Sequence, residues 1–238
     1  MALIEVERLE KHYGEGEERT DALCDISFKI DEGDFIAIMG PSGSGKSTLL
    51  HIMGFLDRPS SGIFRFEGKT IDEYSDDELA AIRNKKLGFI FQSFHLLPRT
   101  TVLENVKLPL VYSGIKESLW DEKARAAIEA VGLSHRISHD AVHLSGGEKQ
   151  RVAIARSLVN DPKVVFADEP TGNLDSKSGQ AVMEIIQDLN DKKGITVILI
   201  THETYTAEHA ERIIRIKDGM IDNDSKVSNR HKASEFLK

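Results

Sequence analysis

Residues 35–48 read FIAIMGPSGSGKST, an unbroken apolar run that leads straight into a glycine-rich stretch. The apolar part, Phe35 to Met39, lacks the polar alternation of a strand that has one face in water. Such a run followed by glycines is typical of a parallel strand that is buried on both faces and followed by a helix. The sequence therefore predicts an α/β fold whose parallel core begins here.

The glycine-rich stretch matches the spacing of a phosphate-binding P-loop, with a lysine and a hydroxyl residue at its end. Glycines let the backbone wrap around phosphate oxygens, and the amides of the loop and of the next helix donate to negative charge. We expect Lys46 to bridge the β- and γ-phosphates and Ser47 to offer its hydroxyl to Mg²⁺. A glycine-rich turn with a solvated lysine is the alternative. The predicted phosphate-binding residues are Gly40, Pro41, Ser42, Gly43, Ser44, Gly45, Lys46, Ser47 and Thr48.

Two later apolar runs end in polar side chains. Val164–Ala167 leads to Asp168 and Glu169, and Ile195–Ile200 stands shortly before His202. Open α/β sheets bind ligands at the carboxyl ends of their strands. We expect Asp168 to hold Mg²⁺ or its waters, Glu169 to polarise an attacking water, and His202 to contact the γ-phosphate. Such residues alone are common in turns and helix caps, so this interpretation depends on the P-loop upstream.

The rest of the chain shows strand patterns at its start and a polar stretch at its end. Alternating apolar residues over 26–30, with a partner segment at 4–6, predict an antiparallel β region. A helix is expected over about 176–192, between the two later strands. We expect one domain over 1–221 and a polar tail over 222–238 that is mobile or weakly helical.

The middle third reads mainly as helices. Ser75 with Glu78, and Thr101 with Glu104, have the spacing of a capping box. We expect a helical subdomain at about 100–155.

Composition narrows the class of protein. The formal charge of −8 gives no broad basic footprint, so no nucleic-acid partner is expected. The apolar runs are far shorter than the ~20 residues of a membrane-spanning helix, and the start does not resemble a secretory signal. We expect a cytoplasmic protein whose single cysteine, Cys24, has no chemical role.

The stretch Leu144–Gln150 reads LSGGEKQ and resembles the signature segment of the ATP-binding cassette (ABC) superfamily. At the start of a helix it would form a second anion site. The resemblance implies that two copies pair head to tail, with the Ser145 segment of one covering the γ-phosphate of ATP held by Lys46 of the other. It also implies ATP and Mg²⁺ as cofactors, and a RecA-like parallel-sheet core with an N-terminal antiparallel β subdomain and an inserted helical subdomain. The signature residues that would contact nucleotide are Ser145, Gly146, Gly147 and Glu148, the last standing where the family most often has Gln.

Three other positions match the family more weakly. Tyr13 resembles the aromatic residue that stacks on adenine, although packing on the edge sheet would also explain it. Gln92 resembles the residue that links the metal site to the helical subdomain, and a surface amide is the alternative. Asn173–Asp175 resembles the segment that crosses the dimer interface, or it is a helix cap before Ser176.

The sequences of residues 87–92 and 168–175 resemble those of one branch of the superfamily, which includes lipoprotein-releasing, macrolide-exporting and cell-division ATPases. The resemblance implies a subunit that is peripheral on the inner face of the membrane, bound to an integral-membrane permease. Phe94, Leu96, Leu97 and Val102 are candidates for the groove that receives a short permease helix, or they belong to the core of the helical subdomain. A soluble ABC ATPase of cofactor assembly and a regulatory ATPase scaffold without transport remain the alternatives.

Overall fold

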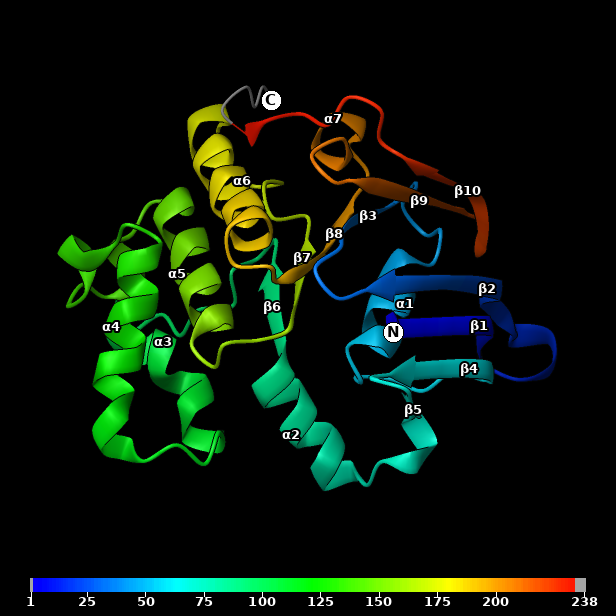
Figure 1. Cartoon of the computed structure of the whole chain (residues 1–238), viewed down its shortest axis with the longest axis horizontal. Helices are drawn as coiled ribbons and strands as arrows, with labels where there is room; N and C mark the ends of the chain where they lie inside the picture. Colours follow the sequence, from blue (N-terminus) through cyan, green and yellow to red (C-terminus); the bar gives the residue numbers. More distant parts are fainter. Residues whose placement is uncertain (1, 234–238) are drawn as a thin grey trace. The chain divides into compact units, whose positions relative to one another are not determined.

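The computed structural model describes residues 2–233 of the chain (Figure 1). The chain divides into two compact units, each with its own network of contacts. Unit one holds the described residues of 1–79 and 196–230, and unit two holds those of 80–195 and 231–238. The first crossing from unit one to unit two falls within helix α2 (Asp76–Lys86).

Unit one begins with an antiparallel sheet, as the alternating segments predict. Val6 pairs with Phe28 on one side and with Phe64 on the other, and all three side chains are buried. Apolar side chains on the same face of neighbouring strands stabilise a sheet by packing across the strands. In spatial order the strands are β2 (Thr20–Asp31), β1 (Ala2–Tyr13), β4 (Ser61–Phe66) and β5 (Lys69–Thr70).

Unit one also contains the buried strand that the sequence predicts. Strand β3 (Phe35–Met39) is buried at all five positions and lies between two parallel neighbours, β8 (Thr196–Thr201) and β9 (Arg212–Lys217). The expectation of a parallel core that begins at Phe35 is confirmed. The helical segments of unit one are η1 (Gly16–Glu18), α1 (Lys46–Met53), η2 (Ile71–Glu73) and α7 (Thr204–Ala207).

The expected polar tail over 222–238 is wrong at its start. Strand β10 (Met220–Lys226) pairs antiparallel with β9, although most of its side chains are exposed. Backbone hydrogen bonds to β9 stabilise this strand without a buried face. The guanidinium of Arg212 adds two hydrogen bonds to the carboxylate of Asp224, each 2.6 Å long. A hydropathy pattern cannot detect such a strand. Residues 234–238 of the expected tail lie outside the described residues.

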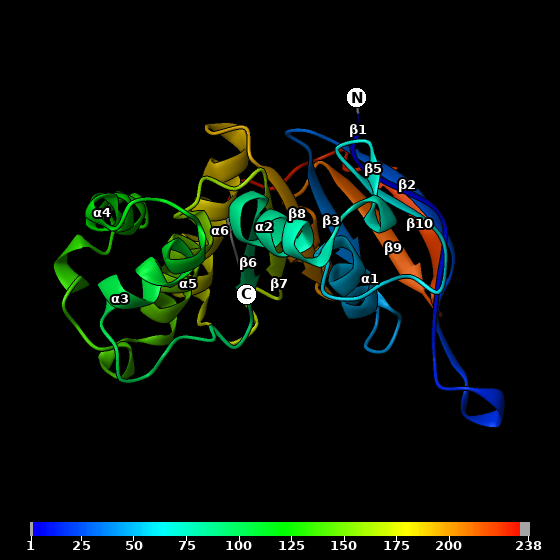
Figure 2. The same ribbon diagram turned by 90° about the horizontal axis from the view of Figure 1, so that it is seen from below.

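Unit two combines a pair of parallel strands with a set of helices. Strands β6 (Leu87–Phe91) and β7 (Val164–Asp168) pair in register from Leu87 with Val164 to Phe91 with Asp168. Helices α3, α4 and α5 contact one another and appear as one group in Figure 2. The helical segments are α3 (Val102–Lys107), η3 (Leu108–Tyr112), η4 (Glu117–Leu119), α4 (Trp120–Ala130), η5 (Ser134–Arg136), η6 (Ala141–His143), α5 (Gly146–Leu158) and α6 (Ser176–Asp191).

Both predicted capping boxes are present. The side chains of Ser75 and Glu78, and those of Thr101 and Glu104, bond reciprocally to the backbone at helix starts. Between residues 100 and 155 the regular structure of the described chain is helical, apart from one isolated bridge. The extent of the helical subdomain stays a prediction.

Candidate nucleotide site

The P-loop of unit one follows β3 directly, and backbone packing fixes its shape. A side-chain carbon at Gly40 would overlap the carbonyl oxygen of Ile216, and one at Gly45 would overlap that of Ala22. Gly45 also has a φ of 103°, which disfavours any residue with a side chain. The two glycines therefore let the loop approach the backbone of neighbouring strands more closely than another residue could.

The polar groups of the P-loop are arranged as an anion site. Lys46 Nζ donates to the carbonyl oxygens of Gly40 (2.8 Å) and Pro41 (2.7 Å), so its ammonium group lies over the loop. Ser47 is exposed at the start of α1, whereas Thr48 is half-buried. Gly45 is the N-cap of α1, and no side chain among the described residues caps this helix end. The first amides of α1 are thus open to phosphate oxygens.

His202 belongs to the same edge of the parallel strands as the P-loop. The register of β3 with β8 pairs Met39 with Thr201, and the next residues along the two strands are Gly40 and His202. The imidazole is exposed. The structure therefore brings His202 and the P-loop together within unit one, as expected from their positions after the strands.

Tyr13 ends β1 with its ring 44 % exposed. Its hydroxyl donates to Asp57 Oδ2 at 3.0 Å, and Lys11 Nζ lies 4.9 Å from the ring centroid. Burial raises the pKa of Asp57, but bonds from Lys11, the Arg58 amide and Tyr13 outweigh it, so the pKa is lowered. The ring is thus fixed at the surface, which fits a stacking role better than a role in the core.

In unit two, Asp168, Glu169 and Gln92 lie at one edge of the β6–β7 pair. Asp168 is paired with Phe91, so Gln92 and Glu169 occupy equivalent positions one residue further on. Glu169 has a φ of 46°, the left-handed region that residues with a side chain rarely adopt. Strain of this kind is concentrated at functional sites, where it fixes the direction of a side chain.

Asn173 is a site residue whose partner the sequence does not reveal. Its amide group donates to Gln92 O at 3.1 Å and accepts from Gln92 Nε2 at 3.4 Å, across 81 positions of sequence. Gly172 lies next to this pair, and a side-chain carbon there would lie 2.7 Å from Gln92 Nε2, so the Gln92 side chain would have to shift. Asp175 caps α6 through the amide of Ser178 at 3.0 Å, as the alternative interpretation of this segment predicts.

The signature segment forms the N-terminus of α5. Ser145 is the exposed N-cap, and its Oγ accepts from the amide of Glu148 at 3.3 Å. Glu148 Oε2 accepts from the amide of Ser145 at 2.9 Å, which completes a capping box that the sequence pattern was not used to predict. Gly147 is buried against α6, and a side-chain carbon there would lie 2.6 Å from Ser178 Oγ. The expected position of the signature at a helix start is therefore correct.

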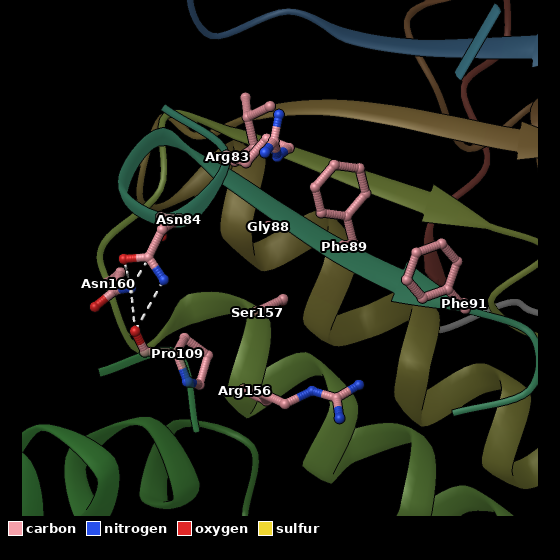
Figure 3. Close-up of a pocket in the computed structure, with 10 residues that line it drawn as sticks. Arg83, Asn84, Gly88, Phe89, Phe91, Pro109, Arg156, Ser157 and Asn160 are labelled. Atoms are coloured by element: carbon pink, nitrogen blue, oxygen red, sulfur yellow. Dashed lines mark hydrogen bonds between the residues drawn. The ribbon is translucent and has the colours of Figure 1, made fainter. Parts of the chain in front are cut away.

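Helix α5 also fixes the segment that follows Gln92. Arg156 donates to the carbonyl oxygens of Phe94 (2.8 Å) and His95 (2.6 Å), and burial lowers the pKa of its guanidinium. Figure 3 shows Arg156 at a pocket of about 200 Å³, with Asn84 and Asn160 bonded around the carbonyl of Pro109. One helix thus carries the signature at its start and positions the segment after Gln92 near its end.

The four candidate groove residues do not share one environment. Phe94 and Leu96 line a pocket of about 190 Å³, and Leu97 is 44 % exposed. Val102 is fully buried at the start of α3, so its role in a groove is wrong and its apolar character serves the core.

The predicted site residues are divided between the two units. Unit one holds Tyr13, the P-loop and His202, and unit two holds Gln92, Asp168, Glu169 and the signature. Sequence reasoning indicates Asn173 but not its bonds to Gln92, and it misses Arg156 altogether. The motif GNLD at 172–175 marks Asn173 as a candidate site residue, whereas nothing in the sequence near Arg156 indicates its hydrogen bonds.

Comparison with known proteins connects this geometry to a family. The family model described as ABC transporter matches residues 23–172. The chain is 51 % identical over 225 residues to the macrolide export ATP-binding/permease protein MacB of Bdellovibrio bacteriovorus, covering 94 % of this chain and 34 % of that protein. It is 49 % identical to the lipoprotein-releasing system ATP-binding protein LolD of Geobacter metallireducens, covering 92 % of this chain and 98 % of LolD. The chain thus spans about a third of the MacB proteins that it matches.

A solved structure agrees over nearly the whole chain. The dimeric post-hydrolysis state of the ATP-binding cassette MJ0796, bound to ADP and phosphate, matches with a TM-score of 0.86 and 41 % identity. The match covers 95 % of this chain and 99 % of that one. The chain therefore belongs to the ABC transporter family, as an ATP-binding cassette of the branch that contains MacB and LolD.

Proposed function

We propose that the chain hydrolyses ATP as a subunit that pairs head to tail with a second copy and drives an integral-membrane permease. The observation that carries this proposal is the presence of two anion-binding helix ends in one chain, at Gly45 and at Ser145. One P-loop suffices for one ATP, so the second helix end is best explained by an ATP that another copy holds. The dimeric state of MJ0796 supports this pairing.

The donors of the chain suit a magnesium nucleotide. The Ser47 hydroxyl, the Gln92 amide oxygen and the Asp168 carboxylate are oxygen donors of the kind that Mg²⁺ prefers. Bound there, Mg²⁺ would offset the charge of the phosphates. Lys46 and the α1 amides would hold the β- and γ-phosphates, and Tyr13 would stack on adenine.

The hydrolytic step would use Glu169 as the group that orients and polarises water. The positive φ of Glu169 sets the direction in which its side chain leaves the backbone, and its position after β7 is where α/β sheets bind ligands. His202 would contact the γ-phosphate and Gln92 would contact the metal and the water. Loss of the γ-phosphate would remove the charge that bridges two copies, so hydrolysis would open the dimer.

The permease contact would use the surface after Gln92. Leu97 is exposed, and Phe94 and Leu96 line the adjoining pocket, which suits the apolar face of a short helix. Within residues 2–233, no helix is long and apolar enough to span a membrane. The chain would therefore attach to the inner face of the membrane through the permease.

A single variant tests the enzymatic part of this proposal. Glu169→Gln should bind ATP, hydrolyse it at least about a hundredfold more slowly, and accumulate as a dimer with ATP in sedimentation velocity. Turnover near that of the unaltered chain would contradict the role of Glu169.

The partner is tested in membranes. The tagged Glu169→Gln chain, solubilised gently with ATP, should co-purify with a permease in fixed stoichiometry, whereas ATP-dependent recovery of soluble proteins alone would contradict the membrane role. Leu97→Asp should abolish stimulation of the ATPase by that permease. The matched variant Val142→Asp alters another exposed apolar residue beside the same pocket and maps how far the contact extends.

A further inference from the structure

Glu148 places a carboxylate in the first turn of α5, the helix end that the proposed function assigns to the γ-phosphate of the partner copy's ATP. Helix N-termini attract anions through their free amides and their positive dipole end. A carboxylate at the same end repels a phosphate. The signature of this chain therefore carries a charge that works against its proposed ligand.

Arg136 lies against this carboxylate. Its Nε donates to Glu148 Oε1 at 2.8 Å, while Glu148 Oε2 accepts from the Ser145 amide. The Glu148 side chain is only 14 % exposed and that of Arg136 is 36 % exposed, so solvent screens the pair less than a surface ion pair. The Ser145 amide first, and Arg136 in addition, outweigh the effect of burial and lower the pKa of Glu148 to about 2. The carboxylate is therefore charged at neutral pH and its charge is opposed by Arg136.

Arg136 is itself held in place from its other side. Its NH1 lies 3.1 Å from His139 Nε2, and because a guanidinium can only donate, the ring nitrogen accepts. The backbone between them is a tight turn, in which the His139 amide donates to the Arg136 carbonyl at 2.9 Å. Arg136 thus has one fixed orientation, with a donor on Glu148 and another on His139.

We infer that Arg136 is a positioning residue of the ATP site formed between two copies, which neutralises Glu148 and keeps it in the capping box. With Glu148 held and neutralised, the Ser145 Oγ accepts from the Glu148 amide and its hydrogen stays free to donate to a γ-phosphate oxygen. This inference rests on the proposed function, because that phosphate belongs to the partner copy's nucleotide. Arg136 itself need not touch the nucleotide.

A double-mutant cycle tests the link between the two residues. The variants Arg136→Ala, Glu148→Gln and their combination are made in the full Glu169→Gln chain, and ATP-dependent dimerisation is measured by sedimentation velocity. Arg136→Ala should weaken dimerisation by about tenfold, the effect of leaving a nearby charge unopposed. Glu148→Gln should not weaken it, because glutamine also completes a capping box. The double variant should dimerise within about twofold of Glu148→Gln alone, since no charge remains to be neutralised.

Three controls separate this role from a structural one. Binding of a fluorescent ATP analogue to dilute monomer should be the same for Arg136→Ala as for the parent, because that step uses the P-loop. Arg125→Ala removes an exposed arginine from α4 and should leave dimerisation unchanged. If Arg136→Ala does not fold, Arg136→Gln replaces it, because it can still donate to Glu148 but has no charge.

The outcomes distinguish this inference from the proposed function. If the parent Glu169→Gln chain does not dimerise with ATP, the proposed pairing is wrong and the role of Arg136 in it falls as well. If the parent dimerises and Arg136→Ala dimerises equally well, only the inference is overturned. An equal loss from Arg136→Ala with and without Glu148→Gln would also overturn it, because Arg136 would then act independently of Glu148.

Discussion

The two helix ends that we propose as phosphate sites, at α1 and at α5, are built in opposite ways. At α1 the N-cap is a glycine, and the first turn consists of Lys46, Ser47 and Thr48. At α5 the N-cap is Ser145, and the first turn contains Glu148, whose carboxylate is bonded back to the cap. No side chain caps the α1 end, and its first turn adds a cation, whereas at the α5 end the amides of Ser145 and Glu148 are already bonded to side chains.

The difference indicates different tasks for the two ends. An open helix end with a lysine gains most from a phosphate, and so it suits the copy that holds the nucleotide. A capped helix end keeps its structure without a ligand, and so it suits a phosphate that is bound to another molecule and contacts it only part of the time. The capped end therefore suits a contact that forms and breaks in each cycle.

The largest expected effect is on ATP binding at the uncapped N-terminus of α1. Lys46→Ala should weaken ATP binding by at least about a hundredfold, because it removes the cation that opposes the phosphates. The midpoint of thermal unfolding should change little, since the hydrogen bonds from Lys46 to the carbonyl oxygens of Gly40 and Pro41 lie within one loop. Titration with a fluorescent ATP analogue, beside circular dichroism melts, checks both statements. Retention of normal affinity would contradict the assignment of the loop.

The next effect concerns the packing that supports the capped end. Gly147→Ala should lower the free energy of unfolding by about 2 kcal/mol, because the added carbon would overlap Ser178 and force the helices apart. Gly146→Ala is the matched control, since its nearest neighbour, Leu174 Cδ2, would be 3.5 Å away. Urea unfolding of both variants measures the difference, and equal stability of the two would refute the close approach of α5 to α6.

The charge at the capped end should appear in the dependence of stability on pH. The pKa of Glu148 is lowered from 4.5 to about 2 in the folded chain, chiefly by the Ser145 amide and then by Arg136. A carboxyl with a lowered folded pKa adds stability above pH 4.5, and that stability is lost as the pH falls toward 2. After allowance for partial exposure, the contribution is on the order of 1.5 kcal/mol.

Glu148→Gln isolates this contribution from that of the other acidic groups. The free energy of unfolding of the variant should fall less steeply than that of the parent between pH 4.5 and 2, as measured by urea unfolding at a series of pH values. Parallel curves for the two chains would show that Glu148 titrates alike when folded and unfolded.

The smallest effect concerns the cap itself. Ser145→Ala removes the acceptor of the Glu148 amide and should cost about 1 kcal/mol of stability. Binding of ATP to the monomer should be unchanged, while ATP-dependent dimerisation in the Glu169→Gln background should weaken. Ser42→Ala, at an exposed position of the P-loop, is the comparison, because any loss that it causes should appear already in the binding of ATP to the monomer. A loss of monomer binding in Ser145→Ala would show that the two ends do not have separate tasks.

Patterns within a few residues predict most of the fold. The apolar run at β3, the alternation in β1 and β2, and the capping boxes at Ser75 and Thr101 are local, and the structure confirms them. Strand β10 was missed because its stability comes from its partner strand and from Arg212 rather than from a buried face. Val102 was misjudged because an apolar residue looks the same in a groove and in a core.

In the candidate site, too, local motifs are predicted from the sequence and contacts between distant residues are not. The P-loop and the acidic pair after β7 are predicted by short motifs whose spacing follows from the chemistry of phosphate. The pairing of Asn173 with Gln92 and that of Arg136 with Glu148 connect residues that are 81 and 12 positions apart. Such contacts depend on how loops pack, and a single sequence contains no periodic signal for them.

The close approach of Gly40 to Ile216 and of Gly45 to Ala22 has a consequence for how this chain can change over evolutionary time. In both cases the atom nearest to the added carbon is a main-chain carbonyl oxygen, which every amino acid supplies, and the next nearest is a side-chain atom, Ser44 Oγ or Leu23 Cδ2. The contact with the loop therefore does not itself specify the side chains at positions 22 and 216, although Ile216 is buried in the core. The shape of the P-loop thus depends on the path of the neighbouring backbone at these two points as well as on the side chains of Ser44 and Leu23.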